Sequence, residues 1–494
     1  MNPKPVRTRF APSPTGRMHL GSARTALYSF LVARHTGGSF FLRIEDTDQK
    51  RFVPGSEQEL IDGLHWLGLE YDEGPDIGGP HGPYRQTERR EIYTEYAWKL
   101  VELGHAFPCF CTPERLEKVR HEQMRNKQNP RYDGTCRSLS PDEARRRVLA
   151  GERHVIRFKM PKEGSITTTD LVRGSITTEN SALDDSVLLK SDGLPTYHLA
   201  AMVDDHLMEI THVIRGSEWL PSMPLHVHVI RAFGWELPEF VHLSVFLKPS
   251  GKGKMSKREA AEAMKDGHSI FIGDMKELGY IPEGVLNWIA LMGWGVSEED
   301  VMTLDEMIAR FDINNLTPAP PAINFAKLDH FNATHIRQLQ AGDLAARIKP
   351  YFVREGLAVE DAKLMRIIPL IRERLVTLDD CLPFAAWFFK ETVTPEPAEL
   401  VAKGLSASQT AGMVRQSYEI LAVLPELRHD LAEPPMRNLV EQLGLGPNQV
   451  FGSLRVAITG QTVSPPLFES MEIVGKEKVL ERLNQAIKIL EELK

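Results

Sequence analysis

A tight turn near the start of the chain constrains the fold more than any other feature of the sequence. Residues 6–11 alternate in polarity and are rich in strand formers, and apolar residues then recur at helical spacing over 23–31. Prolines and a glycine at 12–16 close the loop between them. The helix directs its free N–H groups at this loop, so we expect an anion site beside His19 and Gly21. The simpler alternative is that His19 only caps the helix.

Strands and helices continue to alternate through much of the first half of the chain. A strand is expected at 39–44, followed by a helix that Ser56 caps. Two further strands are expected at 211–215 and 242–248, each preceded by a helix. This alternation is typical of a doubly wound parallel sheet, which binds ligands beyond the carboxyl ends of its strands.

The alternating pattern is interrupted once and later ends. Residues 107–192 show charged helices and short antiparallel strands, and beyond residue 325 only helical periods remain. We therefore expect an α/β fold: a Rossmann-like, doubly wound parallel sheet with an inserted α+β connective domain, followed by an all-α C-terminal region.

Composition limits the class of protein. With 494 residues the chain is too long for one hydrophobic core, and it has no apolar run long enough to span a membrane. The N-terminus shows no apolar targeting segment, and four cysteines give no disulfide framework, so we expect a cytoplasmic protein. The net charge of -8 argues against indiscriminate nucleic-acid binding but leaves specific RNA binding open.

A basic loop follows the last expected strand of the sheet. Residues 251–258 read Gly-Lys-Gly-Lys-Met-Ser-Lys-Arg, which places four cations beside two glycines. Such a loop can wrap a polyphosphate, although a charge run taken by itself is more often a solvated loop. The loop and the first turn belong to one expected sheet, although they lie far apart in the sequence.

Together the two stretches resemble the two signature motifs of class I aminoacyl-tRNA synthetases. His19-Leu20-Gly21-Ser22 matches the first motif, and Lys254 to Arg258 match the second. Four further segments resemble the glutamate-specific branch of that class: 11–16, 43–48, 203–206 and 214–219. The resemblance extends in order over the whole chain. The chain is similar in kind to the bacterial-type glutamyl-tRNA synthetases.

The resemblance implies ATP-dependent activation of glutamate to glutamyl-adenylate and transfer of the acyl group to the 3′ end of tRNA(Glu). Mg²⁺ is implied as the counterion of ATP. Such chemistry needs positioned positive charge and no covalent enzyme intermediate. The residues expected to be catalytic are His19, Gly21, Lys254, Lys257 and Arg258, and those expected to bind ATP are Pro12, His19, Gly21, Ser22 and Lys257.

A substrate with a second carboxylate needs a fixed cation, and the planar fork of arginine suits a carboxylate. By resemblance, the glutamate site is formed by Arg9, Ser13, Glu45, Tyr197, Arg215 and Trp219. Arg9 and Arg215 each lie at the end of an expected strand. Without the resemblance, each arginine would be assigned to a surface ion pair. The histidines at 226 and 228 show no ligand pattern and are expected to be structural.

Three cysteines and a tyrosine form a candidate metal site. Cys109 and Cys111 are followed by Tyr132 and Cys136, which is enough for a tetrahedral Zn²⁺ site. Relatives that bind zinc show this arrangement, some with a histidine where this chain has Ser138. Tyr132 or water is then the expected fourth ligand, and the alternative is a set of ordinary buried thiols.

The helical C-terminal third resembles the bacterial anticodon-binding cage, through segments 370–375 and 454–460. Arg372 and Arg374 are candidates to read the anticodon, with helix pairing as the alternative. The expected partners are tRNA(Glu), L-glutamate and ATP, with no membrane, and the expected state is a monomer. The expected domains are the two halves of a Rossmann catalytic domain at 1–106 and 193–250, the connective insertion at 107–192, a stem-contact domain at 251–323, and helical domains at 324–392 and 393–494.

Three other functions are compatible with parts of this pattern. An enzyme that attaches glutamate to a modified anticodon base would be shorter and would lack the helical third. A non-catalytic RNA-binding homologue would not need His19, Gly21 and Lys257, and a generic nucleotidyltransferase would have no use for an anticodon cage. The sequence does not distinguish charging of tRNA(Glu) alone from charging of tRNA(Gln) as well.

Overall fold

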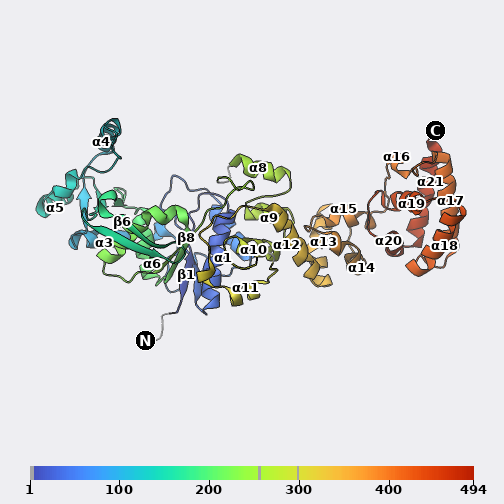
Figure 1. Cartoon of the computed structure of the whole chain (residues 1–494), viewed down its shortest axis with the longest axis horizontal. Coiled ribbons are helices and arrows are strands. Elements are labelled where there is room, and N and C mark those ends of the chain that lie inside the picture. The colour runs from blue at the N-terminus through green and yellow to red at the C-terminus, as the bar shows by residue number, and fades with distance from the viewer. Residues whose placement is uncertain (1–4, 254–256, 298–299, 494) are drawn as a thin grey trace. The chain divides into compact units, whose positions relative to one another are not determined.

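The computed structural model describes residues 5–253, 257–297 and 300–493. They form two compact units (Figure 1). The first contains Met1–Met275 and Val285–Phe325, and the second contains Lys276–Gly284 and Ala326–Lys494. Among the described residues, no helix is both long and apolar enough to cross a membrane.

The centre of the first unit is a parallel sheet made of two strand pairs. Strand β1 (Arg7–Phe10) pairs with β2 (Ser39–Leu42), and β8 (His212–Gly216) pairs with β9 (Glu239–Leu243). The backbone N–H of Thr211, directly before β8, donates to the carbonyl of Arg7 at 3.0 Å, which joins the two pairs. The parallel α/β arrangement expected from the sequence is confirmed.

Helices cover both faces of this sheet. Helix α1 (Leu20–His35) links β1 to β2 and packs against β1, β2 and β8. Three helices share a hydrophobic core with Phe41 of β2, Val213 of β8 and Phe240 of β9. They are α3 (Arg90–Glu102), α6 (Tyr197–Leu207) and α7 (Met223–Ala232).

The segment between α3 and α6 is the interruption that the sequence indicated. Its antiparallel sheet has the order β3–β4–β7, and a separate hairpin joins β5 to β6. The strand bounds are β3 (Ala106–Cys109), β4 (Val155–Phe158), β5 (Ser165–Asp170), β6 (Gly174–Glu179) and β7 (Val187–Leu189). Helices α4 (Pro113–Arg125) and α5 (Pro141–Leu149) lie between β3 and β4. The hairpin reaches the parallel sheet, because Leu171 N–H donates to the carbonyl of Phe240 in β9 at 2.9 Å.

Two local expectations were wrong. Helix α2 (Ser56–Trp66) is preceded by Gly55 as N-cap, and the Ser56 hydroxyl donates to the carbonyl of Val53. The last strand begins at Glu239 and ends at Leu243 instead of spanning 242–248. Its partner β8 ends at Gly216, which pairs with Leu243, so the ladder stops there and the chain turns to pair Leu247 with Ala322.

Four helices follow Leu247 in the chain, and two of them, at 272–277 and 282–291, span the boundaries between the two units. They are α8 (Lys257–Lys265), α9 (Ile272–Glu277), α10 (Pro282–Leu291) and α11 (Leu304–Arg310). Thr303 and Glu306 form a capping box at the start of α11.

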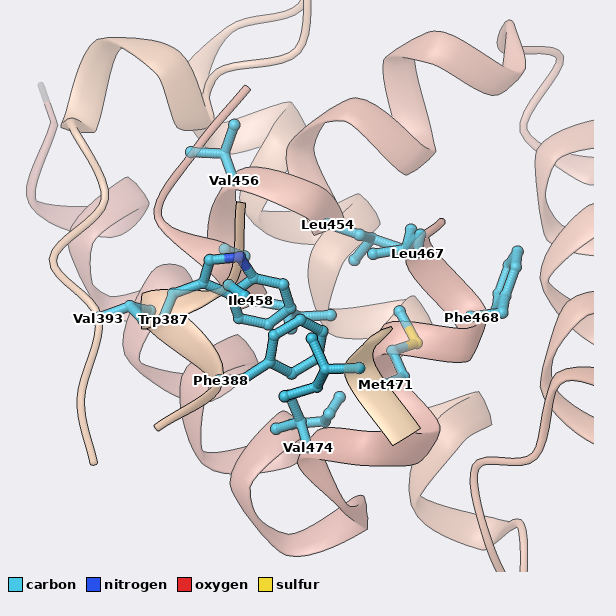
Figure 2. Packing of buried hydrophobic residues seen from close by; sticks show 14 of the residues in the cluster. Trp387, Phe388, Val393, Leu454, Val456, Ile458, Leu467, Phe468, Met471 and Val474 are labelled. Carbon is cyan, nitrogen blue, oxygen red and sulfur yellow. The ribbon is translucent and has the colours of Figure 1, made fainter. Parts of the chain in front are cut away.

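The second unit has no strand among its described residues. Its helices are α12 (Phe325–Gln338), α13 (Ala341–Arg354), α14 (Asp361–Ile371), α15 (Cys381–Ala385), α16 (Pro397–Leu400), α17 (Ala407–Val423), α18 (His429–Gln442), α19 (Pro447–Thr459), α20 (Leu467–Val474) and α21 (Lys476–Glu492). One hydrophobic core runs through them, and Trp387 stacks on Phe388 with ring centroids 3.8 Å apart (Figure 2). The helical C-terminal region expected from the sequence is confirmed.

Candidate active site

The loop between β1 and α1 carries the first signature motif. His19 is exposed and caps α1, because its Nδ1 accepts hydrogen bonds from the backbone N–H groups of Gly21 at 3.0 Å and Ser22 at 3.3 Å. A Cβ atom at Gly21 would lie 2.9 Å from His19 Cε1, so any larger residue there would displace the imidazole from its capping position. His19 therefore does cap the helix, as the simpler alternative stated. Imidazole and helix N-terminus lie together at one point, which is suited to an anion.

The same loop is fastened to the chain that follows α8. Leu20 N–H donates to the carbonyl of Ile270 at 2.7 Å, and Ile272 N–H donates to that of Met18 at 3.0 Å. The second signature motif lies just before and at the start of α8. Lys254 is outside the described residues, and so are the side chains of Lys257 and Arg258. The backbone nevertheless ties the segment after the basic motif to the loop of His19.

Arg215, the fourth residue of β8, is held by neutral groups. Its Nε donates to Nε2 of His242 at 2.9 Å, and its Nη1 lies 3.3 Å from the Tyr197 hydroxyl and 3.1 Å from Nδ1 of His226. Arg215 is 5% exposed, its Nη2 atom is buried without a hydrogen-bond partner, and none of these three hydrogen-bond partners among the described residues is a carboxylate. A buried guanidinium in this state is suited to bind a carboxylate.

Two aromatic residues extend the arrangement around Arg215. The ring of Tyr197, the first residue of α6, stacks on Trp219 with centroids 4.0 Å apart. Burial raises the pKa of Tyr197 above its usual value, so the hydroxyl stays protonated. The structure thus brings together Arg215, Tyr197 and Trp219, as the sequence predicted.

Arg9 is engaged differently from Arg215. Its guanidinium forms a two-bond ion pair with Asp205 at 3.0 and 3.2 Å, and its Nη1 donates to the carbonyl of Ile214. Arg43 donates to the same carboxylate and to Glu45, each at close range. Burial would raise the pKa of Asp205, but the charges of Arg9 and Arg43 outweigh it and lower that pKa. Arg9 and Glu45 therefore belong to a buried, charge-balanced network directly beside β8.

Ser13 and Pro12 lie in the loop after β1. Pro12 accepts a hydrogen bond from the backbone of Glu45 at 3.0 Å, which places the loop against the residues that follow β2. Ser13 is exposed, and its carbonyl accepts from Thr15 N–H. The loop therefore adjoins the Glu45 network through its backbone.

Sequence reasoning missed two residues beside Arg215 and assigned a third no role there. His242 is the register partner of Arg215 in β9, and Asp170, at the end of β5, accepts from His242 Nδ1 at 2.7 Å. His226 on α7, expected to be only structural, contacts the guanidinium directly. A histidine paired across a parallel ladder with an arginine was the available signal. Asp170 comes from another part of the chain, and the sequence contained no signal that would place it beside His242.

The cysteine cluster is assembled as expected. The Sγ atoms of Cys109, Cys111 and Cys136 lie within 4.8 Å of one another. The Tyr132 hydroxyl lies 3.4 Å from Cys109 Sγ and 3.7 Å from Cys111 Sγ. Ser138 takes no part, because its hydroxyl donates to the carbonyl of Thr135. Three thiols and a phenol at this spacing fit a tetrahedral Zn²⁺ site.

Two family models match successive parts of the chain. The model of "tRNA synthetases class I (E and Q), catalytic domain" matches residues 5–330, and the model "Anticodon binding domain" matches residues 343–487. The catalytic model thus contains the whole parallel sheet, both signature motifs and the Arg215 site. Fold and site together define a class I tRNA synthetase.

Individual relatives narrow this class. The chain is 44% identical to a glutamate–tRNA ligase of Roseiflexus sp. (strain RS-1), over 98% of this chain and 96% of that protein. It is also 44% identical to the glutamate–tRNA ligase of Chloroflexus aurantiacus, over 99% of both chains. A crystal structure of a glutamate tRNA ligase from Elizabethkingia meningosepticum in complex with its amino acid has a TM-score of 0.89 at 38% identity, covering 99% of this chain and 100% of that one. The chain belongs to the glutamate–tRNA ligase family.

Proposed function

We propose that this class I glutamate–tRNA ligase recognises the side-chain carboxylate of L-glutamate with Arg215. One observation carries the assignment: a buried guanidinium held only by neutral groups, with Nη2 unpartnered among the described residues. A carboxylate at Nη2 would supply both the missing hydrogen bond and the missing negative charge. Glutamine offers a neutral amide, which leaves the guanidinium poorly compensated at a cost of about 2–4 kcal/mol.

We propose the two chemical steps of a glutamate–tRNA ligase for this chain. An α-carboxylate oxygen of glutamate attacks the α-phosphorus of ATP, and diphosphate leaves as glutamyl-adenylate forms. A hydroxyl of the terminal ribose of tRNA(Glu) then attacks the acyl carbon, and AMP leaves. His19, Gly21 and Ser22 orient the ATP phosphates, while Lys254, Lys257 and Arg258 offset the charge on the departing diphosphate. Mg²⁺ accompanies ATP as its counterion.

The remaining assignments are proposed on the same basis. Pro12 and Ser13 line the approach to ATP and glutamate, and Arg9 and Glu45 shape the amino-acid site through their ion-pair network. Trp219 closes the site by stacking on Tyr197. We assign tRNA(Glu) as the RNA partner, a monomer as the working state and the cytoplasm as the compartment. Charging purified tRNA(Glu) and tRNA(Gln) side by side tests the RNA assignment, with tRNA(Glu) accepted.

Replacing Arg215 tests the amino-acid site. We expect Arg215→Ala to raise the KM for glutamate at least about thirtyfold, because about 2–4 kcal/mol of charged hydrogen bonding is lost. The KM for ATP should change less than twofold. Lys257→Ala should instead slow activation more than tenfold and leave the KM for glutamate unchanged. ATP–diphosphate exchange in the presence of tRNA(Glu) measures all four quantities.

The matched control is Arg231→Ala, which removes an exposed arginine from α7 in the same unit. It should leave both KM values unchanged. If Arg215→Ala raised the KM values for ATP and glutamate equally, the assignment of Arg215 to the amino acid would be wrong.

We also propose that the cysteine cluster holds one structural Zn²⁺ through Cys109, Cys111, Cys136 and Tyr132. Burial raises the pKa of the Cys111 thiol to about 11, so Zn²⁺ would have to displace a proton from this side chain on binding. When bound, the ion would link β3 to the turn around Cys136. Elemental analysis should find one zinc per chain, and Cys136→Ser should lose it. Cys381→Ala, which removes the buried cysteine of the second unit, should retain it. A Cys136→Ser protein with full zinc content would contradict the assignment.

A further inference from the structure

The hydrogen bonds around Arg215 determine where the protons of His242 lie. Arg215 Nε carries hydrogen and can only donate, so His242 Nε2, 2.9 Å away, must accept. The single proton of the neutral imidazole is then on Nδ1, which donates to Asp170 Oδ2 at 2.7 Å. His242 and Asp170 are 0% and 2% exposed. The order Asp170, His242, Arg215 is thus a chain in which each donor faces an acceptor.

The carboxylate of Asp170 is itself fixed by several backbone hydrogen bonds. Its Oδ1 accepts from the backbone N–H groups of Val172 and Arg173 at 2.9 and 2.7 Å. Its Oδ2 also accepts from the backbone N–H of His242 at 2.9 Å. Every bond to the carboxylate comes from a donor, so the group stays ionised and acceptor-only. It cannot present a donor to His242 and reverse the direction of the chain.

A second histidine fixes the other side of the guanidinium. Arg215 Nη1 donates, so His226 Nδ1 at 3.1 Å accepts and its Nε2 carries the proton, which faces His198 Nδ1 at 3.0 Å. Nε and Nη1 are therefore both engaged, and Nη2 alone is left for a ligand. The orientation of the guanidinium is set by neutral acceptors that leave its charge uncompensated at close range.

We propose that His242 and Asp170 are positioning residues for glutamate recognition: Asp170 fixes the tautomer of His242, and His242 fixes the plane of Arg215 so that Nη2 meets the substrate carboxylate. This rests on the proposed role of Arg215. In carboxylate–histidine pairs generally, the carboxylate fixes the tautomer of the histidine, and a ring in the wrong tautomer cannot make its other hydrogen bond. Here the pair holds an arginine for binding and takes no part in bond making.

Two substitutions of His242 separate its two hydrogen bonds. In His242→Gln the amide can present its oxygen where Nε2 accepts from Arg215. In His242→Asn the shorter amide reaches Asp170 and leaves Arg215 Nε without an acceptor. We expect His242→Asn to raise the KM for glutamate at least tenfold and His242→Gln to raise it less than threefold. The KM for ATP should change less than twofold in both, measured by ATP–diphosphate exchange with tRNA(Glu).

The control is His228→Asn, on α7, whose side chain bonds Asn180 at 2.9 Å and does not touch Arg215. It should keep both KM values. In Asp170→Asn the NH2 group faces donors in either orientation, His242 in one and the backbone N–H groups of Val172 and Arg173 in the other, so the variant should raise the KM for glutamate at least tenfold. Thermal unfolding of each variant shows whether it is folded.

The outcomes separate this inference from the assignment of Arg215. If Arg215→Ala raises the KM for glutamate while folded His242→Asn does not, the positioning role is wrong and the binding role stands. If neither variant affects it, the binding role fails as well. Equal effects of the Asn and Gln variants on both substrates would show that His242 is merely structural and would overturn the inference.

Discussion

At the scale of single residues, His226 and His242 make the stability of the first unit depend on pH. Burial, together with the charge of Arg215, lowers the pKa of His226 far below its usual value, and burial likewise lowers that of His242 despite Asp170. Arg215 and His198 face His226, and Arg215 and Asp170 face His242. Both rings are therefore neutral in the folded state, while in the unfolded chain they take up protons below about pH 6.5.

Because the unfolded chain binds more protons, the free energy of unfolding should fall as the pH is lowered from 7 to 5. Each histidine contributes up to about 1.4 kcal/mol per pH unit. Urea unfolding followed by fluorescence should show the midpoint moving to lower urea, with a smaller shift in His226→Gln. An unfolding midpoint that rises on acidification, or an equal shift in that variant, would contradict this account.

The residues at the site were predictable only where their signals were local. Arg9 and Arg215 lie near the ends of strands and Trp219 lies in the segment 214–219, so the sequence could name them as candidates. Tyr197 was a candidate by resemblance alone. The sequence could not show that Arg9 is occupied by Asp205 while Arg215 is held by neutral groups. That difference depends on burial and on partners distant in sequence.

At the scale of single elements, helix α17 offers a clear test of capping. The Ser406 hydroxyl accepts from Gln409 N–H, and the Gln409 side chain accepts from Ser406 N–H at 2.8 Å. Ser406→Ala should lower the free energy of unfolding of the second unit by about 1 kcal/mol, because one N–H at the helix start loses its acceptor. Ser408→Ala, at an exposed position two residues on, should change it by less than about 0.5 kcal/mol. Urea unfolding followed by circular dichroism compares the two, and equal effects would remove the role of the cap.

Elements were predicted best where their ends are set by local chemistry. Thr112 with Pro113 starts α4, and Thr303 starts α11, and both starts use residue types whose capping role is legible in the sequence itself. The last strand of the sheet was placed wrongly because residues 245–247, just beyond its true end, are also apolar. Its end is set by the end of β8, which is information from another segment.

At the scale of the whole molecule, the net charge of -8 predicts selective RNA binding. An acidic surface repels polyanions in general, so only an RNA that matches local basic residues overcomes it. We expect a tenfold mass excess of poly(U) to leave charging of tRNA(Glu) unchanged at 150 mM KCl. The KM for tRNA(Glu) should still rise about tenfold or more between 50 and 200 mM KCl, since phosphate contacts release counterions. The KM for glutamate serves as the control and should change less than twofold; effective competition by poly(U) would contradict this prediction.

The carboxylate that orients Arg215 lies on the hairpin β5–β6, which the chain adds between the two halves of its parallel sheet. A chimaeric enzyme that received this hairpin from a donor without an acid at the end of its first strand would leave Nδ1 of His242 without the acceptor that Asp170 supplies. Such a hybrid would keep its sheet and its nucleotide loop, yet its choice between acidic and amide substrates would be weakened. If Arg215 binds the substrate carboxylate as proposed, the hairpin takes part in amino-acid selection and cannot be exchanged as an independent module.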